Sequence, residues 1–229
     1  CGACVDQCPV DIEHVDHILD LRRHEVMAKS EFPDEFGQLF GNLDSKGNPW
    51  GLPPRGRLAW AKDLDFPVPV VGKDVDSLAE VDYLLWVGCA GAYDDKGKQT
   101  TRALAELLHV AGVSFAVLGN AETCSGDPAR RAGNEATYQM LATQNIETFD
   151  ELGVEKIIVT CAHCYNTFAN EYPQVGGNYT VLHHTQLLNR LVRDKKLVPV
   201  ARPSEVGGMS TARDAASTAP SVTYHDPCY

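Results

Sequence analysis

The pattern of apolar and polar residues divides the chain into two unlike parts near residue 81. Beyond that point, short apolar runs alternate with stretches in which apolar residues recur every three or four positions. Such alternation is typical of βαβ units, in which helices join parallel strands and cover the sheet. The expected strands are residues 81–87, 114–119, 156–160, 179–184 and 221–226. The pattern therefore predicts an α/β fold with a Rossmann-like parallel sheet.

The helices expected between these strands follow the apolar residues that recur at helical spacing. They are residues 100–112, a long or broken helix over 129–153 that ends at Gly153, and residues 185–196. In the first of them, the residues expected to point inward are Ala103, Leu104, Leu107 and Leu108.

Before residue 81 the pattern is helical only over residues 11–29, where the apolar residues form one face. Residues 31–80 are rich in Pro and Gly and show little periodicity, so we expect an irregular connector there. Its tryptophans, Trp50 and Trp60, are expected to pack the connector onto the α/β unit. A second segment of small and polar residues, 201–221, is expected to be a mobile linker.

Composition and charge narrow the function classes. The chain has 229 residues, of which 44% are apolar, so it can bury the core of one α/β domain and a smaller element. A formal net charge of -11, without a cluster of Lys and Arg, argues against a nucleic-acid partner, whose phosphates demand a basic surface. No apolar run in the sequence is long enough to span a bilayer.

The cysteines show where chemistry is placed. Because several lie in short-spaced pairs, in a chain large enough to fold without disulfides, metal ligation is favoured over disulfides and over inert buried thiols. The eight cysteines are Cys1, Cys4, Cys8, Cys89, Cys124, Cys161, Cys164 and Cys228.

The opening run CGACVDQCP matches the last three cysteines of the C-x2-C-x2-C-x3-C-P motif that holds [4Fe-4S] clusters in bacterial-type ferredoxins. The motif's first cysteine would lie three residues before Cys1. In ferredoxins with two clusters, the cysteine before the proline ligates the other cluster. We therefore expect Cys1 and Cys4 to hold one cluster and Cys8 to ligate a second. Paired cysteines also occur in zinc knuckles, but the x3-C-P continuation favours iron and sulfur.

The remaining cysteines follow expected strands. Cys89 comes two residues after the first strand, Cys124 lies in the loop after the second, and Cys161 directly follows the third. Since parallel strands end at one edge of the sheet, these thiols are expected to meet there, together with Cys164 of the same CAHC motif. A helix that begins at CAHC would lower the pKa of its first thiol. The spacing therefore predicts a metal site at Cys89, Cys124, Cys161 and Cys164; Cys228 follows the last expected strand.

Other polar residues near these strand ends have weaker assignments. His163 lies inside CAHC, and His183 and His184 follow the fourth expected strand. A hydrogen bond to sulfur or a plain loop role is favoured for them over metal ligation, which stays open. Asp127 is expected to cap the next helix, with Pro128 at its first position. No Walker-type or GxGxxG loop is present, so no nicotinamide cofactor is indicated.

Several phrases resemble one known family. The spacing of the thiols from Cys89 to Cys164, together with VGCAGAY, ETCSGDPARRAGNE, TCAHCYNTF and VLHHTQLL, resembles the CCG or cysteine-rich domain of heterodisulfide reductase-related proteins. CGACVDQCPVDI and GNPWG resemble the ferredoxin and linker region of actinobacterial-type membrane iron-sulfur-binding reductases, and YHDPCY resembles the start of a second CCG domain.

This resemblance implies a domain organisation. The implied units are the end of an α-helical [4Fe-4S] ferredoxin-like domain (1–30), a connector (31–80), a first CCG domain (81–200), a linker (201–221) and a truncated second CCG domain (222–229).

The resemblance also implies an iron-sulfur oxidoreductase subunit that passes electrons between a flavoprotein, such as electron-transfer flavoprotein, and a membrane quinone. In such proteins a membrane segment precedes the ferredoxin unit, which implies a place at the cytoplasmic face of the plasma membrane. One residue departs from the family pattern, because Ser125 stands where a full CCG motif has a second adjacent cysteine. Four thiols suit a [4Fe-4S] cluster or a structural zinc, so a zinc-stabilised scaffold and a thiol-disulfide reductase also stay open.

Overall fold

A computed structural model describes residues 3–200 of the chain, and the expected strand at 221–226, the linker and the second CCG start lie outside this range. Within it, the strands form one parallel sheet in the order β2-β1-β3-β4. The strands are β1 (Tyr83–Trp86), β2 (Phe115–Ala116), β3 (Lys156–Val159) and β4 (Thr180–His183). The predicted α/β class with a Rossmann-like parallel sheet is confirmed.

Alternate residues of the inner strand β1 and its continuation enter two cores, one on each face of the sheet. Leu84 and Trp86 pack with α7 (Glu135–Leu152), whereas Leu85 and Val87 pack with α5 (Asp95–Val110) and α9 (His184–Arg193). Since successive side chains of a strand point to opposite faces, a strand covered on both faces must be apolar throughout. This explains the continuous apolar run at residues 83–87.

The inward face of α5 differs from the expected one. Ala103 and Leu107 are exposed, and the buried positions are instead Thr101, Leu104, Ala105 and Leu108. Both sets repeat at helical spacing, so the sequence pattern alone does not choose between them. In the observed orientation, α5 contacts the connector: the Arg102 Nε donates to the Trp60 carbonyl at 3.0 Å.

The long helix expected over 129–153 is broken at Gly133. The two parts are α6 (Asp127–Ala132) and α7, and Gly153 ends α7 as predicted. Gly133 has a φ of +93°, and a Cβ atom there would lie 2.5 Å from the Arg22 carbonyl oxygen, so this position requires glycine. The prediction that Asp127 caps its helix is wrong by one position, because the cap is Gly126 and Asp127 is the first helical residue.

The connector is not irregular throughout, in contrast to the expectation from its sequence. Residues Asp34–Lys46 form a helix, α3, whose apolar residues Phe36, Leu39, Phe40 and Leu43 follow the spacing of an amphipathic helix. The surrounding Pro and Gly residues obscured this short periodic stretch. Beyond it lie three 3-10 turns, Pro54–Gly56, Ala59–Ala61 and Leu78–Glu80. Trp60 is fully buried against the α/β unit, as predicted. Trp50 is half exposed but also packs on that unit, edge-on against Tyr93 with the ring centres 6.5 Å apart.

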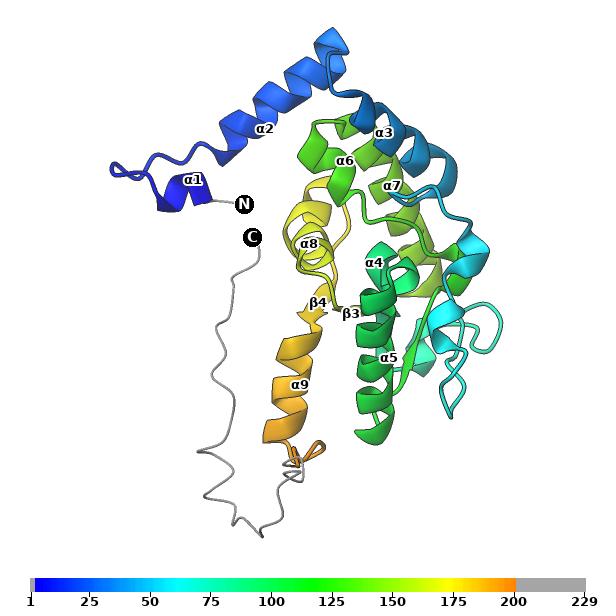
Figure 1. Cartoon of the computed structure of the whole chain (residues 1–229). Coiled ribbons are helices and arrows are strands. Elements are labelled where there is room, and N and C mark those ends of the chain that lie inside the picture. The colour runs from blue at the N-terminus through cyan, green and yellow to red at the C-terminus, as the bar shows by residue number, and fades with distance from the viewer. Residues whose placement is uncertain (1–2, 201–229) are drawn as a thin grey trace, which may run out of the picture.

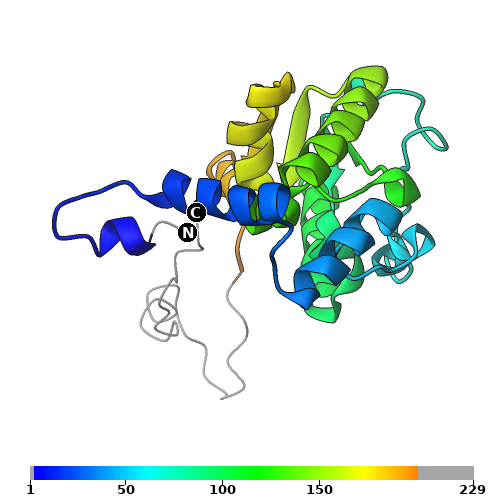
Figure 2. The same cartoon turned by 90° about the horizontal axis from the view of Figure 1, so that it is seen from above.

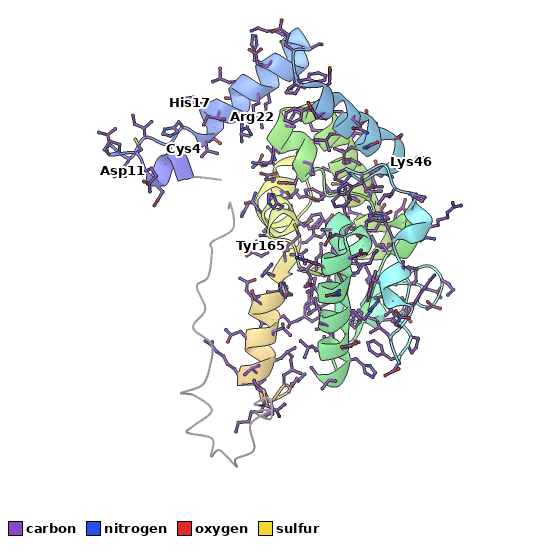
Figure 3. The ribbon with its side chains drawn as sticks, in the orientation of Figure 1. Cys4, Asp11, His17, Arg22, Lys46 and Tyr165 are labelled. Carbon is purple, nitrogen blue, oxygen red and sulfur yellow. The ribbon has the colours of Figure 1, made fainter. Side chains whose placement is uncertain are left out.

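The N-terminal region consists of α1 (Ala3–Asp6), α2 (Val15–Arg23) and a π-helical turn (His24–Lys29). No residue of α2 is buried. Figures 1 and 2 show α1 and the start of α2 reaching away from the α/β body, and Figure 3 shows Cys4 and Asp11 at that far end. Among residues 3–200, no helix combines the length and the apolar character that crossing a membrane requires.

Five short helical segments of the described residues complete the α/β unit. Two are α-helices, α4 (Gly88–Tyr93) and α8 (Ala162–Asn166). The others are a 3-10 turn at Gly119–Ala121, a π-helical turn at Thr167–Glu171 and a 3-10 turn at Tyr172–Val175.

Candidate metal centre

A cavity of about 640 Å³ lies at the carboxyl ends of β1 and β3. These strands are neighbours. The chain adds β2 on the outer side of β1 and β4 on the outer side of β3, so the order of the strands reverses between β1 and β3. Such a switch point is where open parallel sheets form their ligand crevice. The cavity is lined by all four thiols expected to meet at this edge, Cys89, Cys124, Cys161 and Cys164.

Cys89 is the second residue of α4, directly after β1. The preceding Gly88 has a φ of +72°, which turns the chain from strand to helix in a conformation that favours glycine. The N–H groups of Val87 and Gly88 both donate to the buried carboxylate of Glu122, at 3.0 Å and 2.8 Å. The position of Cys89 is therefore fixed through a carboxylate that comes from the loop of Cys124.

The loop that carries Cys124 and Ser125 is fixed through its carbonyl groups. The Asn145 side-chain amide donates to the Cys124 carbonyl at 2.9 Å, and the Tyr172 hydroxyl donates to the Ser125 carbonyl at 3.0 Å. Gly126 then ends the loop with a φ of +91°. Cys124 and Ser125 are thereby held buried in the wall of the cavity.

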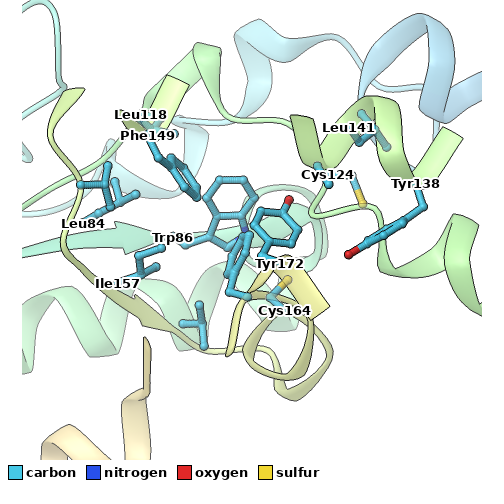
Figure 4. Close-up of a cluster of buried hydrophobic side chains, with 14 of the residues drawn as sticks. Leu84, Trp86, Leu118, Cys124, Tyr138, Leu141, Phe149, Ile157, Cys164 and Tyr172 are labelled. Atoms are coloured by element: carbon cyan, nitrogen blue, oxygen red, sulfur yellow. The ribbon is translucent and has the colours of Figure 1, made fainter. Parts of the chain in front are cut away.

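Cys161 and Cys164 flank the start of α8, with Cys161 at the N-cap after β3, as the sequence predicted. The Cys164 thiol is buried and donates to the Ser125 hydroxyl at 3.6 Å. Figure 4 shows Cys124 and Cys164 on one side of the Trp86 ring, at the end of the apolar cluster that supports the cavity, whereas Leu84 lies on the other side.

The described thiols are free, and the four at the cavity form two neighbouring pairs. The neighbouring Cys124 lowers the pKa of Cys89, and the neighbouring Cys164 lowers the pKa of Cys161 to about 6. The same pairing raises the pKa of Cys124 and Cys164, as does their burial. One thiol of each pair is therefore readily ionised, and the thiolate is the form that binds metals.

A zinc ion and an iron-sulfur cluster place different demands on these thiols. Four thiolates around one zinc, each at about 2.3 Å, must lie within about 4 Å of one another. In the described part of the chain, no group of three or more His, Cys, Asp or Glu side chains is arranged to hold a metal ion. The four thiols line one cavity. Iron-sulfur clusters bind cysteine thiolates on separate irons, so they suit thiols placed around a cavity.

Two buried charged residues beside Cys89 were not predicted from the sequence. Arg57, from the connector, and Glu122, from the loop before Cys124, form a buried ion pair with a 2.9 Å contact, and the Arg57 Nη2 also donates to the Cys89 Sγ at 3.5 Å. No sequence pattern relates residues 65 positions apart. The one available signal was that Glu122 lies close to the candidate ligand Cys124, in the loop after an expected strand.

The histidines divide into one at the cavity and two beside it. His163 lines the cavity, and its Nδ1 lies 3.0 Å from the buried Asp127 carboxylate, which raises the pKa of His163. His183 bonds through its ring nitrogens to the Thr185 hydroxyl and the Thr160 carbonyl. Burial lowers the pKa of its neighbour, His184. Asp127, expected to be a helix cap, therefore serves to orient His163.

The N-terminal cysteines lie apart from this cavity. Cys4 is exposed, and the Cys8 Sγ accepts a hydrogen bond from the Ile12 N–H at 3.4 Å. That bond and the Val10 N–H lower the pKa of Cys8, which suits a thiolate ligand. Two expected ligands, Cys1 and Cys228, lie outside the described residues.

Residues 83–169 match the protein family described as the cysteine-rich domain, CCG. The whole chain is 42% identical to part of the EtfAB:quinone oxidoreductase of Syntrophomonas wolfei and 40% identical to part of the "Probable iron-sulfur-binding oxidoreductase FadF" of Bacillus subtilis. It is 26% identical to part of one subunit of the dihydromethanophenazine:CoB–CoM heterodisulfide reductase of Methanosarcina barkeri.

These alignments cover 100% of the chain, but the chain spans 30% of the length of the first two relatives and 51% of the third. No solved structure matches the chain. The matched family segment runs from β1 to the turn after α8, so it contains the four thiols of the cavity.

Proposed function

Because the segment from β1 to α8 belongs to the CCG cysteine-rich domain family, in a chain homologous to iron-sulfur oxidoreductases, we propose that this chain holds iron-sulfur clusters and carries electrons. The observation that supports the proposal best is the meeting of Cys89, Cys124, Cys161 and Cys164 in one cavity at the switch point of the sheet.

The residues at the cavity have separate roles in this proposal. The four thiolates hold the cluster, which supplies one-electron oxidation and reduction when it is bound. Trp86 and the apolar cluster below the cavity keep water from one side of the site. Ser125, in place of a further thiol, places a hydroxyl 3.6 Å from the Cys164 sulfur, to which it would donate once Cys164 is a thiolate ligand. We therefore assign a four-thiolate [4Fe-4S] centre to this cavity rather than zinc.

A second centre is proposed at the N-terminus, where Cys1, Cys4 and Cys8 follow the ferredoxin spacing. Cys228 is proposed as a ligand in a second CCG unit. An electron path from the N-terminal region to the CCG cavity then runs within one polypeptide.

The donor and the acceptor are proposed from the relatives. One relative is named EtfAB:quinone oxidoreductase and another "Probable membrane-anchored ferredoxin". We propose by analogy that the complete protein takes electrons from a flavoprotein such as electron-transfer flavoprotein and delivers them to a membrane quinone, on the cytoplasmic face of the plasma membrane.

Metal analysis of the full-length protein, purified without oxygen, tests the proposal. We expect iron and acid-labile sulfide, broad visible absorbance and a paramagnetic signal after reduction. Cys161→Ser should remove the iron of the CCG cavity. The exposed Ser45→Ala is the matched control, because its hydroxyl bonds only to the Gly41 carbonyl of its own helix. One zinc per chain, with no sulfide at this cavity, would refute the proposal in favour of a zinc-stabilised scaffold.

Thiol-disulfide exchange has one observation in its favour. The pKa of Cys161 is lowered to about 6, and Cys164 lies three residues further on, as in redox-active C-x2-C motifs. However, Cys89 and Cys124 line the same cavity, which a two-thiol mechanism does not require. A metal-free protein that exchanges disulfides through Cys161 would support this alternative.

A further inference from the structure

Arg57 places a buried positive charge against the proposed cluster site. Its side chain is 2% exposed, and its Nη1 lies 2.9 Å from the Glu122 carboxylate, which is also 2% exposed. A buried arginine requires such a partner, because an unpaired buried charge is strongly destabilising. The pair is therefore a built feature of the structure, in contact with the cavity thiol Cys89.

The Glu122 carboxylate is saturated with donors. One oxygen accepts from the Arg57 Nη1 and from the Gly88 N–H, and the other accepts from the Val87 N–H. Burial raises the pKa of Glu122, while Arg57 and the two N–H groups act in the opposite direction and favour the ionised carboxylate. The contacts hold the pair in one orientation, in which the second nitrogen of Arg57, Nη2, faces the Cys89 sulfur.

That nitrogen reaches a proposed ligand. The Arg57 Nη2 donates to the Cys89 Sγ at 3.5 Å and to the Gly47 carbonyl at 3.1 Å. The positive end of the pair therefore faces the sulfur.

Arg57 belongs to the connector rather than to the matched family segment, which begins at residue 83. Its guanidinium carbon lies 5.4 Å from the ring centre of Tyr93, and Gly47 immediately follows α3. The guanidinium thus joins the end of α3, the connector and the helix of Cys89. A change in the docking of the connector would move this charge relative to the sulfur.

We propose that Arg57 sets the reduction potential of the centre at Cys89, and that the connector thereby adjusts the CCG cavity for electron transfer; this inference rests on the proposed function. A donor hydrogen bond and a positive charge at a thiolate favour the reduced cluster, which carries one more negative charge. One electron enters from a reduced flavin or iron-sulfur donor and leaves to an oxidised acceptor of the same class. Arg57 itself neither gains nor loses a proton or an electron.

The test compares reduction potentials in the full-length protein with its clusters. Arg57→Met combined with Glu122→Gln removes both charges without leaving a buried carboxylate unpaired. We expect its iron content to match the wild type and its potential to fall, with about a tenfold change in the electron-transfer equilibrium, or about 59 mV for one electron. An unchanged potential with full iron content would overturn the inference.

Two further variants keep the test decisive. Arg102→Met is the matched control, because Arg102 also ties the connector to the α/β unit, through the Trp60 carbonyl and Asp63, and lies outside the lining of the cysteine cavity. Its potential should equal that of the wild type; a fall as large as in the double variant would overturn the inference by showing a general effect of connector docking.

If the double variant loses its iron, Arg57→Lys decides the question. The ammonium keeps the charge but lacks the planar fork that reaches both Glu122 and Cys89. A potential below that of the wild type supports the inference, and an unchanged potential refutes it. Iron analysis separates this failure from failure of the proposed function, since a wild-type protein without iron in the CCG cavity would refute both.

Discussion

Asn145 links the Cys124 loop to the core through a single side chain. Its amide nitrogen donates to the Cys124 carbonyl at 2.9 Å and to the Tyr172 hydroxyl at 3.0 Å, and its oxygen accepts from the Thr123 hydroxyl at 2.9 Å. The side chain is buried, so water cannot readily replace these bonds.

We predict that Asn145→Ala lowers the free energy of unfolding by about 1–3 kcal/mol, because buried polar groups lose their partner. Denaturant unfolding of the metal-free protein measures this change. Asn170→Ala serves as the control, since Asn170 makes an exposed contact with Asn166, and its effect should stay within about 0.5 kcal/mol. Equal effects of the two variants would contradict the structural role of Asn145.

Tyr138 is a buried side chain whose hydroxyl group affects stability at alkaline pH. Its ring is fully buried beneath the Arg130 guanidinium, whose central carbon lies 4.5 Å from the ring centre. Within residues 3–200, its hydroxyl makes no hydrogen bond of normal geometry. Burial raises the pKa of Tyr138 to about 12.

We predict that Tyr138→Phe removes part of the alkaline loss of stability. The folded protein keeps the Tyr138 proton to a higher pH than the unfolded chain does, so its stabilising effect is complete below pH 10 and is lost as the pH rises toward 12. Unfolding measured from pH 8 to pH 11 should show a shallower decline for the variant, with stability at pH 8 within about 1 kcal/mol of the wild type. An unaltered decline would contradict this prediction.

At the scale of elements, the start of α6 depends on one glycine. Gly126 has a φ of +91°, and a Cβ atom there would lie 2.8 Å from a Tyr138 ring carbon and 3.2 Å from its carbonyl oxygen. The loop that carries Cys124 and Ser125 therefore packs directly against α7. Any added side chain must displace the loop or the helix.

We predict that Gly126→Ala lowers stability by more than Gly112→Ala and also lowers the iron content. Both substitutions place alanine at positive φ, which costs about 1–3 kcal/mol. Gly112 has a φ of +66° but no described atom within 4 Å of the added Cβ, so it carries the backbone cost alone. Thermal unfolding and iron analysis of both variants test this. Equal losses would show that the packing against Tyr138 is unimportant.

At the scale of the whole molecule, the two groups of cysteines lie in separate parts of the chain. The exposed Cys4 belongs to the N-terminal region that reaches away from the α/β body, whereas the other group lines the cavity of the sheet (Figure 1). The contacts of α2 with the α/β body come from its end, where the Arg22 side chain donates to the Arg131 carbonyl at 2.9 Å and Arg23 pairs with Glu135 at 3.1 Å. The cysteine-bearing α1 and the start of α2 reach away from that body (Figure 1).

We predict that the two centres assemble independently. In the full-length protein, Cys4→Ala should lower the iron content and remove one paramagnetic signal, while the signal of the CCG cavity keeps its shape and intensity. Cys89→Ala should have the converse effect. Loss of both signals in either variant would contradict independent assembly.

The sequence by itself determined the class of the fold and the identity of the candidate ligands. Apolar runs that alternate with helical periodicity are local signals, and they indicated β1, β3, β4 and α9 correctly. Cysteine spacing relative to these strands indicated which thiols meet, because parallel strands share one edge. It missed α3, where Pro and Gly on either side masked a regular pattern, and it placed the wrong face of α5 inward.

The tertiary structure alone decided what surrounds the thiols. The pairing of Arg57 with Glu122, the hold of Asn145 on the Cys124 loop and the contact of Asp127 with His163 join residues that are far apart in the chain. Such contacts depend on how packed elements lie in space, and no periodicity or spacing along the chain encodes them. The candidate ligands could therefore be identified from the sequence, whereas the charges and hydrogen bonds around them arise only when the connector and the sheet pack together.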